Sequence, residues 1–297
     1  MAAVTANGKT EIKKDFTRVQ RDIEASQKIH RESMSYAQGV IRTLKQNKVA
    51  MLSLIFIVFL ILVAIFGPIL FPDYQKQDLL HTLQKPSKEH LLGTDELGRD
   101  VLTRLIRGTR ISLFIGFAAE TINLVVGILY GGIAGFLGGK VDNAMMRIID
   151  VVMSVPQTLV MILMLTVLKR GMGTLILSLT ITGWVGLARL VRGQILALRE
   201  NEYAVAAKVL GAGKREILFH HLLPNTIGPI IVNYTMSIPG AIGAEASWGN
   251  MLQFGASQFP ATLWLFFAPA VLFALSMLAF NLLGDGLRDA LDPRMRR

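Results

Sequence analysis

An uncharged run of 23 residues, 49–71, constrains this chain more than any other feature of its sequence. A helix of that length rises about 34 Å at 1.5 Å per residue, which is enough to cross the hydrocarbon core of a bilayer. The run starts too deep in the chain and is too long for a cleavable signal peptide, and no small-residue cleavage pattern follows it. The composition agrees, since 52% of the residues are hydrophobic and 18% are charged. The run therefore predicts a transmembrane helix in an integral membrane protein.

Five further apolar segments follow the first one, which gives about six transmembrane helices and an all-α fold. They lie at roughly 111–139, 144–168, 175–191, 227–246 and 263–283. An even number of spans places both termini on one side of the membrane, and basic residues mark the cytoplasmic side. That side carries 22 of the Lys and Arg residues and the opposite side carries 9. We therefore expect both termini in the cytoplasm, and we read the formal charge of +10 as an orientation signal rather than a nucleic-acid site.

The spans divide the chain into five parts. We expect a cytoplasmic tail at 1–48, the first span at 49–71, an extracytoplasmic loop with an interfacial helix at 72–110, a core of five spans at 111–287 and a cytoplasmic tail at 288–297. The tail at 1–48 mixes both signs of charge, so part of it could form an amphipathic helix on the lipid surface.

Several classes of chemistry lack the residues they need. The chain has no cysteine, and its five histidines show no metal-ligand spacing. The run Gly8, Lys9, Thr10 lacks the first glycine of a phosphate-binding loop, so any ATP would be bound by another subunit. We therefore expect no catalytic residue, no metal site and no cofactor on this chain. A secondary transporter, which would show inverted repeats and charged residues at mid-membrane, is the less favoured alternative.

The second predicted span carries glycines at every fourth position. They are Gly127, Gly131, Gly135 and Gly139. Small residues at this spacing form one helix face on which a neighbouring helix approaches closely. The neighbour could be a second membrane subunit or a helix of the same bundle, and the bundle is the simpler alternative. Carboxylates inside spans often mark pathways, and Glu120 is the deepest candidate. Asp150, Glu245 and Asp285 fall near span ends and are expected to be structural or interfacial.

A charged, glycine-containing stretch, EYAVAAKVLGAGKREILFHHLLPN, separates the fourth and fifth spans on the predicted cytoplasmic side. Asn201 can cap a helix there, and Glu202 suits the positive end of the helix dipole. Ala206 and Ala207 would leave a face slim enough to enter a groove, and Gly211 allows a turn. A second short helix, 214–223, is expected to end at Pro224.

The spacing of this stretch resembles the cytoplasmic coupling loop of binding-protein-dependent ABC import permeases. The pattern E-x3-AA-x3-G with a downstream I-x4-LP is carried here by Glu202, Ala206, Ala207, Gly211, Ile217 and, slightly displaced, Leu223 and Pro224. The stretches LLGTDELGRDVLTRLIRGTRISL, GGIAGFLGGKVD, ARLVRGQIL and NLLGDGLRDALDPR are also similar to the C-type subunit of oligopeptide and dipeptide permeases. The similarity covers almost the whole chain.

This resemblance implies a type I ABC importer permease fold in a bacterial or archaeal cell (inner) membrane. Similar proteins pair with a homologous B-type permease, two cytosolic ATPases that hold ATP and magnesium, and an extracytoplasmic solute-binding protein. Residues 202–223 would then form the coupling helices that contact an ATPase. Short peptides are the implied substrate; relatives also carry nickel, glutathione or glycosides, and the sequence does not identify substrate-binding residues.

One region departs from the family pattern. Related C subunits usually carry a stretch like LSFLGLG and a proline-containing loop between a Glu-Ala segment and a Trp-Gly element, whereas here Glu245, Ala246 and Ser247 lead directly into Trp248. More than ten expected residues are absent. Either the outer loop is shortened, or a loop is missing from this sequence between Ser247 and Trp248, and the close match of the flanking motifs favours the missing loop.

Overall fold

A computed structural model describes residues 35–71, 74–168, 171–242 and 247–292. The chain divides into two units, Met1–Gln38 and Gly39–Arg297, and the membrane-spanning helices lie in the second. Its described residues are helical or irregular, apart from an isolated antiparallel bridge between Thr94 and Asp100. The all-α prediction is confirmed.

Four described helices are long and apolar enough to span a membrane. They are α3 (Lys48–Leu70), α4 (Val101–Leu137), α7 (Met172–Leu198) and α12 (Leu263–Leu291). The third predicted span, 144–168, is a bent pair instead: α5 (Gly139–Ser154) and α6 (Gln157–Val167) meet at 72°, and counting the pair as one span gives five. The fifth predicted span corresponds to α10 (Ile227–Ile242), with 16 residues; positions 243–246 lie outside the described residues.

Side-chain caps fix where the first two spans begin. The Asn47 side chain accepts a hydrogen bond from the Ala50 amide (3.1 Å) at the start of α3, and Asp100 accepts one from the Thr103 amide (2.8 Å) at the start of α4. Because α4 runs unbroken from Val101, the helix expected at the membrane interface within 72–110 is the first part of this span.

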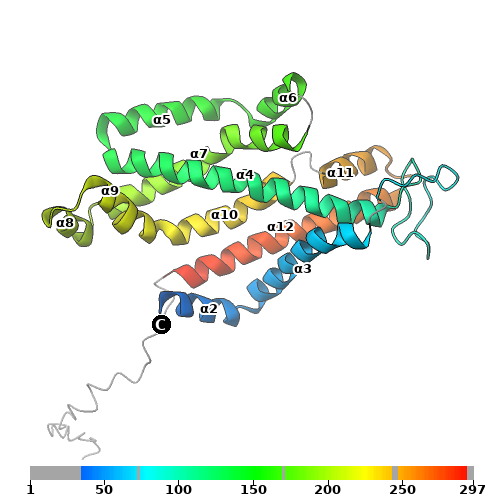
Figure 1. The fold of residues 1–297 in the computed structure, drawn as a ribbon, viewed down its shortest axis with the longest axis horizontal. Helices are drawn as coiled ribbons and strands as arrows, with labels where there is room; N and C mark the ends of the chain where they lie inside the picture. The colour runs from blue at the N-terminus through cyan, green and yellow to red at the C-terminus, as the bar shows by residue number, and fades with distance from the viewer. Residues whose placement is uncertain (1–34, 72–73, 169–170, 243–246, 293–297) are drawn as a thin grey trace, which may run out of the picture. The chain divides into compact units, whose positions relative to one another are not determined.

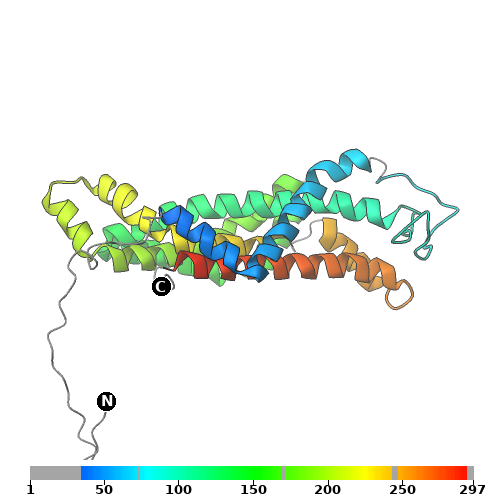
Figure 2. The same cartoon turned by 90° about the horizontal axis from the view of Figure 1, so that it is seen from below.

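The helices pack against one another along two main interfaces, called seams below (Figures 1 and 2). In one seam α4 lies along α7, and in the other α3 lies beside α12 and α4. The second seam contains the fully buried Trp248 of α11 (Ser247–Ser257), whose indole donates a hydrogen bond to the Leu105 carbonyl (3.3 Å). Ser247 and Trp248 are successive residues at the start of α11, and the missing loop between them stays a prediction.

The loop 74–100 is organised around one buried carboxylate. Asp95 is 1% exposed, accepts hydrogen bonds from the amides of Leu97 and Arg99, and pairs with the guanidinium groups of Arg99 (2.7 Å) and Arg104. The indole of Trp264 on α12 donates to the Thr94 carbonyl (3.4 Å). These bonds tie the loop to the ends of α4 and α12.

Candidate functional site

The segment predicted to couple the protein to an ATPase follows α7 directly. It contains α8 (Glu202–Val209), α9 (Lys214–Glu216), the π-helix η1 (Ile217–Leu222) and the 3-10 helix η2 (Leu223–Thr226), which leads into α10. Within the second unit, α8 and α9 lie at the end opposite the loop 74–100 (Figures 1 and 2). The segment between the fourth and fifth predicted spans and the loop before α4 therefore project from opposite ends of the helices, as the span count predicts.

One face of α8 packs inside the protein and the other is exposed. Ala204 and Ala207 are buried in a cluster with residues of α7, η1 and α10, among them Ile195 and Leu222. Ala206 is exposed. The prediction that Ala206 and Ala207 share a free slim face is therefore wrong for Ala207, because successive residues of a helix point about 100° apart and Ala207 takes the inward direction.

One exposed row of α8 is apolar apart from its first residue, and Tyr203 and Lys208 are exposed beside this row. Glu202, Val205, Ala206 and Val209 are exposed at positions i, i+3, i+4 and i+7, which share one side of a helix. Val209 and the following Leu210 are 80% and 87% exposed. We call these five residues the coupling surface. Asn201 occupies the N-cap position, but its side chain makes no capping hydrogen bond.

The spacing between Ala207 and Gly211 has a structural cause. Gly211 has φ +90°, a left-handed conformation that costs a residue with a Cβ roughly 1–2 kcal/mol. Its amide donates to the Lys208 carbonyl (3.1 Å), and the next amide, of Ala212, donates to the Ala207 carbonyl (3.0 Å). This pair of bonds is a Schellman ending of α8. Ala212 also packs against the cluster that contains Ala207, as this ending commonly requires.

The second half of the segment anchors it to the membrane helices. Ile217 and Leu222 are buried, and Leu223 packs against the same cluster. Pro224, exposed, does not end the helical segment as predicted. It lies in the first turn of η2, where its missing N–H costs nothing, and the backbone continues as helix into α10. Among the predicted coupling residues, Glu202 and Ala206 thus face outward, whereas Ala207, Ile217 and Leu223 face the protein's own core.

Three of the four predicted glycines bring α4 against α7. A Cβ on Gly127 would lie 2.9 Å from the Cβ of Leu187, one on Gly135 would lie 2.8 Å from the Arg192 carbonyl oxygen, and one on Gly131 would overlap the Ala188 carbonyl. The neighbour is thus a helix of the same bundle. Gly139 does not belong to this face, because α4 ends at Leu137 and no described atom lies within 4 Å of a Cβ placed there.

Sequence reasoning missed two ion pairs that join α5 to α7. Asp142 pairs with Arg192 (2.6 Å from Nη2), and Asp150 pairs with Arg189 (2.6 Å). Asp150 thus has the basic neighbour expected of it, although its partner could not be named from the sequence. Asp142 and Asp150 are eight residues apart, about two helical turns, and this spacing of acids was the available signal.

Two family descriptions match the chain. Residues 127–297 match the binding-protein-dependent transport system inner membrane component, and residues 35–86 match the N-terminal TM domain of oligopeptide transport permease C. The dipeptide transport system permease protein DppC of Bacillus subtilis is 46% identical over 288 residues, covering 91% of this chain and 89% of the relative. The oligopeptide transport system permease protein OppC of the same species is 43% identical over 287 residues, covering 92% and 94%.

A more distant relative matches over a similar share of its length. The oligopeptide transport system permease protein OppC of Escherichia coli is 36% identical over 288 residues, covering 91% of this chain and 95% of the relative. The two 288-residue alignments each include only 91% of the 297 residues of this chain, which is fewer than 288 residues. The remaining aligned positions are residues of the relatives that have no counterpart here.

Proposed function

The chain belongs to the family of binding-protein-dependent transport system inner membrane components, and from this premise we propose that it is the permease subunit of an ATP-driven importer of short peptides. The all-helical architecture is consistent with a type I ABC importer permease. The relatives named above are dipeptide and oligopeptide permeases, and they favour peptides over nickel, glutathione or glycosides as the substrate. The chain would form half of the translocation pathway in the cell membrane.

The observation that carries the coupling part of the proposal is the exposed apolar tip of α8. Val209 and Leu210 lie on a segment outside the spanning helices, and contiguous exposed apolar side chains usually mark a contact with another protein. The coupling surface fits a groove in a cytosolic ATPase, which would bury both side chains. Glu202 at the first turn of α8 would lie at the edge of that contact, where the positive helix end stabilises its carboxylate.

The packing described above supports a rigid-body mechanism. The inward face of α8 shares a core with α7, η1 and α10, so movement of α8 by an ATPase displaces the spans on either side of the segment. ATPase closure would then switch the permease between inward-facing and outward-facing states. ATP and magnesium would be held by the two ATPases, and this chain would supply no catalytic group.

The remaining partners follow from the family. We propose a homologous B-type permease as the other half of the pathway and an extracytoplasmic solute-binding protein that delivers the peptide. Both termini are expected in the cytoplasm, on the side of the coupling surface, because the basic residues concentrate there.

Uptake by membrane vesicles tests this function. The full-length chain should copurify with two ATPase subunits and a second permease, and vesicles loaded with ATP should take up a labelled dipeptide in the presence of the binding protein. A non-hydrolysable ATP analogue should abolish that uptake. Uptake driven by an ion gradient without ATP would instead establish secondary transport, and uptake of nickel that dipeptides fail to inhibit would overturn the substrate.

A further inference from the structure

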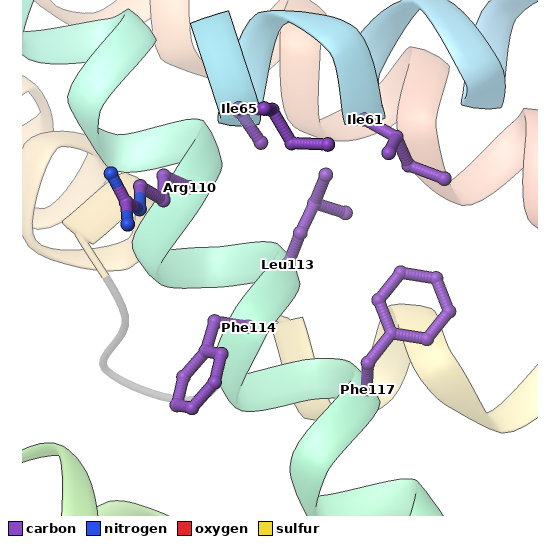
Figure 3. A pocket seen from close by; sticks show the side chains of 7 residues that line it. Ile61, Ile65, Arg110, Leu113, Phe114 and Phe117 are labelled. Atoms are coloured by element: carbon purple, nitrogen blue, oxygen red, sulfur yellow. The ribbon is translucent and has the colours of Figure 1, made fainter. Parts of the chain in front are cut away.

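A groove between α3 and α4 has the features of a lipid site. Its volume is about 350 Å³, and its lining consists of Ile61, Ala64, Ile65, Arg110, Leu113, Phe114 and Phe117. Figure 3 shows the α3 side chains facing Leu113 and Phe117, with Arg110 at the Ile65 end. All of the lining except one guanidinium is apolar.

The charged end of the groove lies near the end of the first span. Ile65 precedes the last residue of α3, Leu70, by five positions, or about 7.5 Å along the helix. A long arginine side chain at that depth reaches the headgroup region of a bilayer, while the apolar lining continues toward the bilayer centre. The groove thus offers an acyl chain an apolar path that ends at a cation.

A second arginine lies one turn away. The Arg107 guanidinium stacks on the ring of Tyr74 with 5.0 Å to the centroid, and its Nε is buried without a hydrogen-bond partner. Among the described residues, no carboxylate lies within 4 Å of either Arg107 or Arg110. Arg110 lines the groove, and Arg107, which lies outside the groove lining, carries the unused Nε donor. Guanidinium groups without a described counter-ion complement an anion that accepts several hydrogen bonds, such as a phosphate.

We propose that this groove binds an acidic phospholipid, with one acyl chain along Ile61, Leu113 and Phe117 and the headgroup phosphate on Arg110 and Arg107. Basic sites between transmembrane helices recognise acidic headgroups in this way. A net negative headgroup is preferred over a zwitterionic one because the two cations face no described acid. On the predicted orientation, the lipid occupies the outer leaflet.

A tryptophan placed in the groove reports the lipid directly. The Phe114→Trp variant of the full-length chain is reconstituted into phosphatidylcholine bilayers with a small fraction of phosphatidylglycerol or phosphatidylcholine whose acyl chains are brominated, and quenching is measured. Val125→Trp is the matched control, since Val125 is also exposed on α4 (53% against 57% for Phe114) but lies outside the groove lining. The signal of the three native tryptophans is subtracted with the unaltered chain.

The lipid proposal gives distinct outcomes. Brominated phosphatidylglycerol should quench Phe114→Trp with about fivefold higher apparent affinity than brominated phosphatidylcholine, the effect of one basic residue near a membrane surface. Val125→Trp should show no preference, and Arg110→Gln should remove the preference at Phe114→Trp, whereas Arg147→Gln, a distant exposed arginine, should keep it. Equal quenching by both lipids, a preference that survives Arg110→Gln, or no quenching because a protein helix covers the groove would each overturn the proposal. None of these readouts depends on transport.

Discussion

Replacing Val209 and Leu210 with serine should detach the permease from its ATPase without unfolding it. Fully burying a valine or leucine side chain contributes about 1.5–3 kcal/mol, and these two are 80% and 87% exposed before docking. With the lower value for each side chain, loss of their burial costs at least about 3 kcal/mol for the pair, which corresponds to at least roughly 100-fold weaker ATPase binding. Neither side chain belongs to a described core cluster, so the unfolding temperature of the chain itself should hardly change.

The assay is equilibrium binding of the purified ATPase to the permease complex in detergent, followed by ATP-dependent uptake in vesicles. The matched control is the pair Leu79→Ser and Leu80→Ser, which removes two side chains that are 69% and 91% exposed at the opposite end of the helices. That control should leave ATPase binding unchanged. Unchanged ATPase binding by the Val209→Ser, Leu210→Ser chain, or an equal loss in the control, would refute the assignment of the coupling surface.

Three further outcomes are expected. Ala206→Trp should keep the unfolding temperature and uncouple ATP hydrolysis from uptake, because Ala206 is exposed. Ala207→Trp should destabilise the chain by about 1–3 kcal/mol because it overfills the core. Equal unfolding temperatures of the two variants would contradict the assignment of an exposed and a buried face to α8. Gly131→Ala should lower the unfolding temperature in detergent because its Cβ would overlap the backbone of α7; a Gly131→Ala chain as stable as the unaltered one would show that α4 and α7 are not in close contact. In intact cells Ser87→Cys should react with an impermeant maleimide and Lys214→Cys only after permeabilisation; the reverse would overturn the orientation.

Most of the architecture could be predicted because bilayer thickness sets a minimum span length. The uncharged run at 49–71 is long enough to cross a bilayer, and it corresponds to α3. The four-residue glycine spacing lets a neighbouring helix approach closely, and it corresponds to the α4–α7 contact. The bend between α5 and α6 was missed because the run 144–168 contains only two charged residues, Arg147 and Asp150, and was read as one continuous span. Pro156, at the start of α6, was the available signal, since the residue before a proline avoids helical geometry.

The candidate site shows a different limit of sequence reasoning. The coupling pattern identified the segment 202–223, but a pattern of small residues does not say which of them face outward. Ala206 and Ala207 differ only in direction, and that direction depends on the cluster formed by α7, η1 and α10. The groove between α3 and α4 could not be predicted from the sequence either. Its lining residues Arg110 and Ile65 are distant in the sequence and meet only when α3 packs on α4.

The close contact at the glycines of α4 packs α4 and α7 together as one rigid unit. At Gly127, Gly131 and Gly135 no side chain of α4 separates it from α7, so no flexible layer can absorb a sideways load. The Arg199 guanidinium, just beyond the end of α7, also donates a hydrogen bond to the Gly135 carbonyl (3.3 Å). In the proposed mechanism, an ATPase that displaces α8, three residues further along, would therefore move both helices together. Because α4 continues to the loop 74–100, the proposed displacement at one end of the helices would also reach the opposite end.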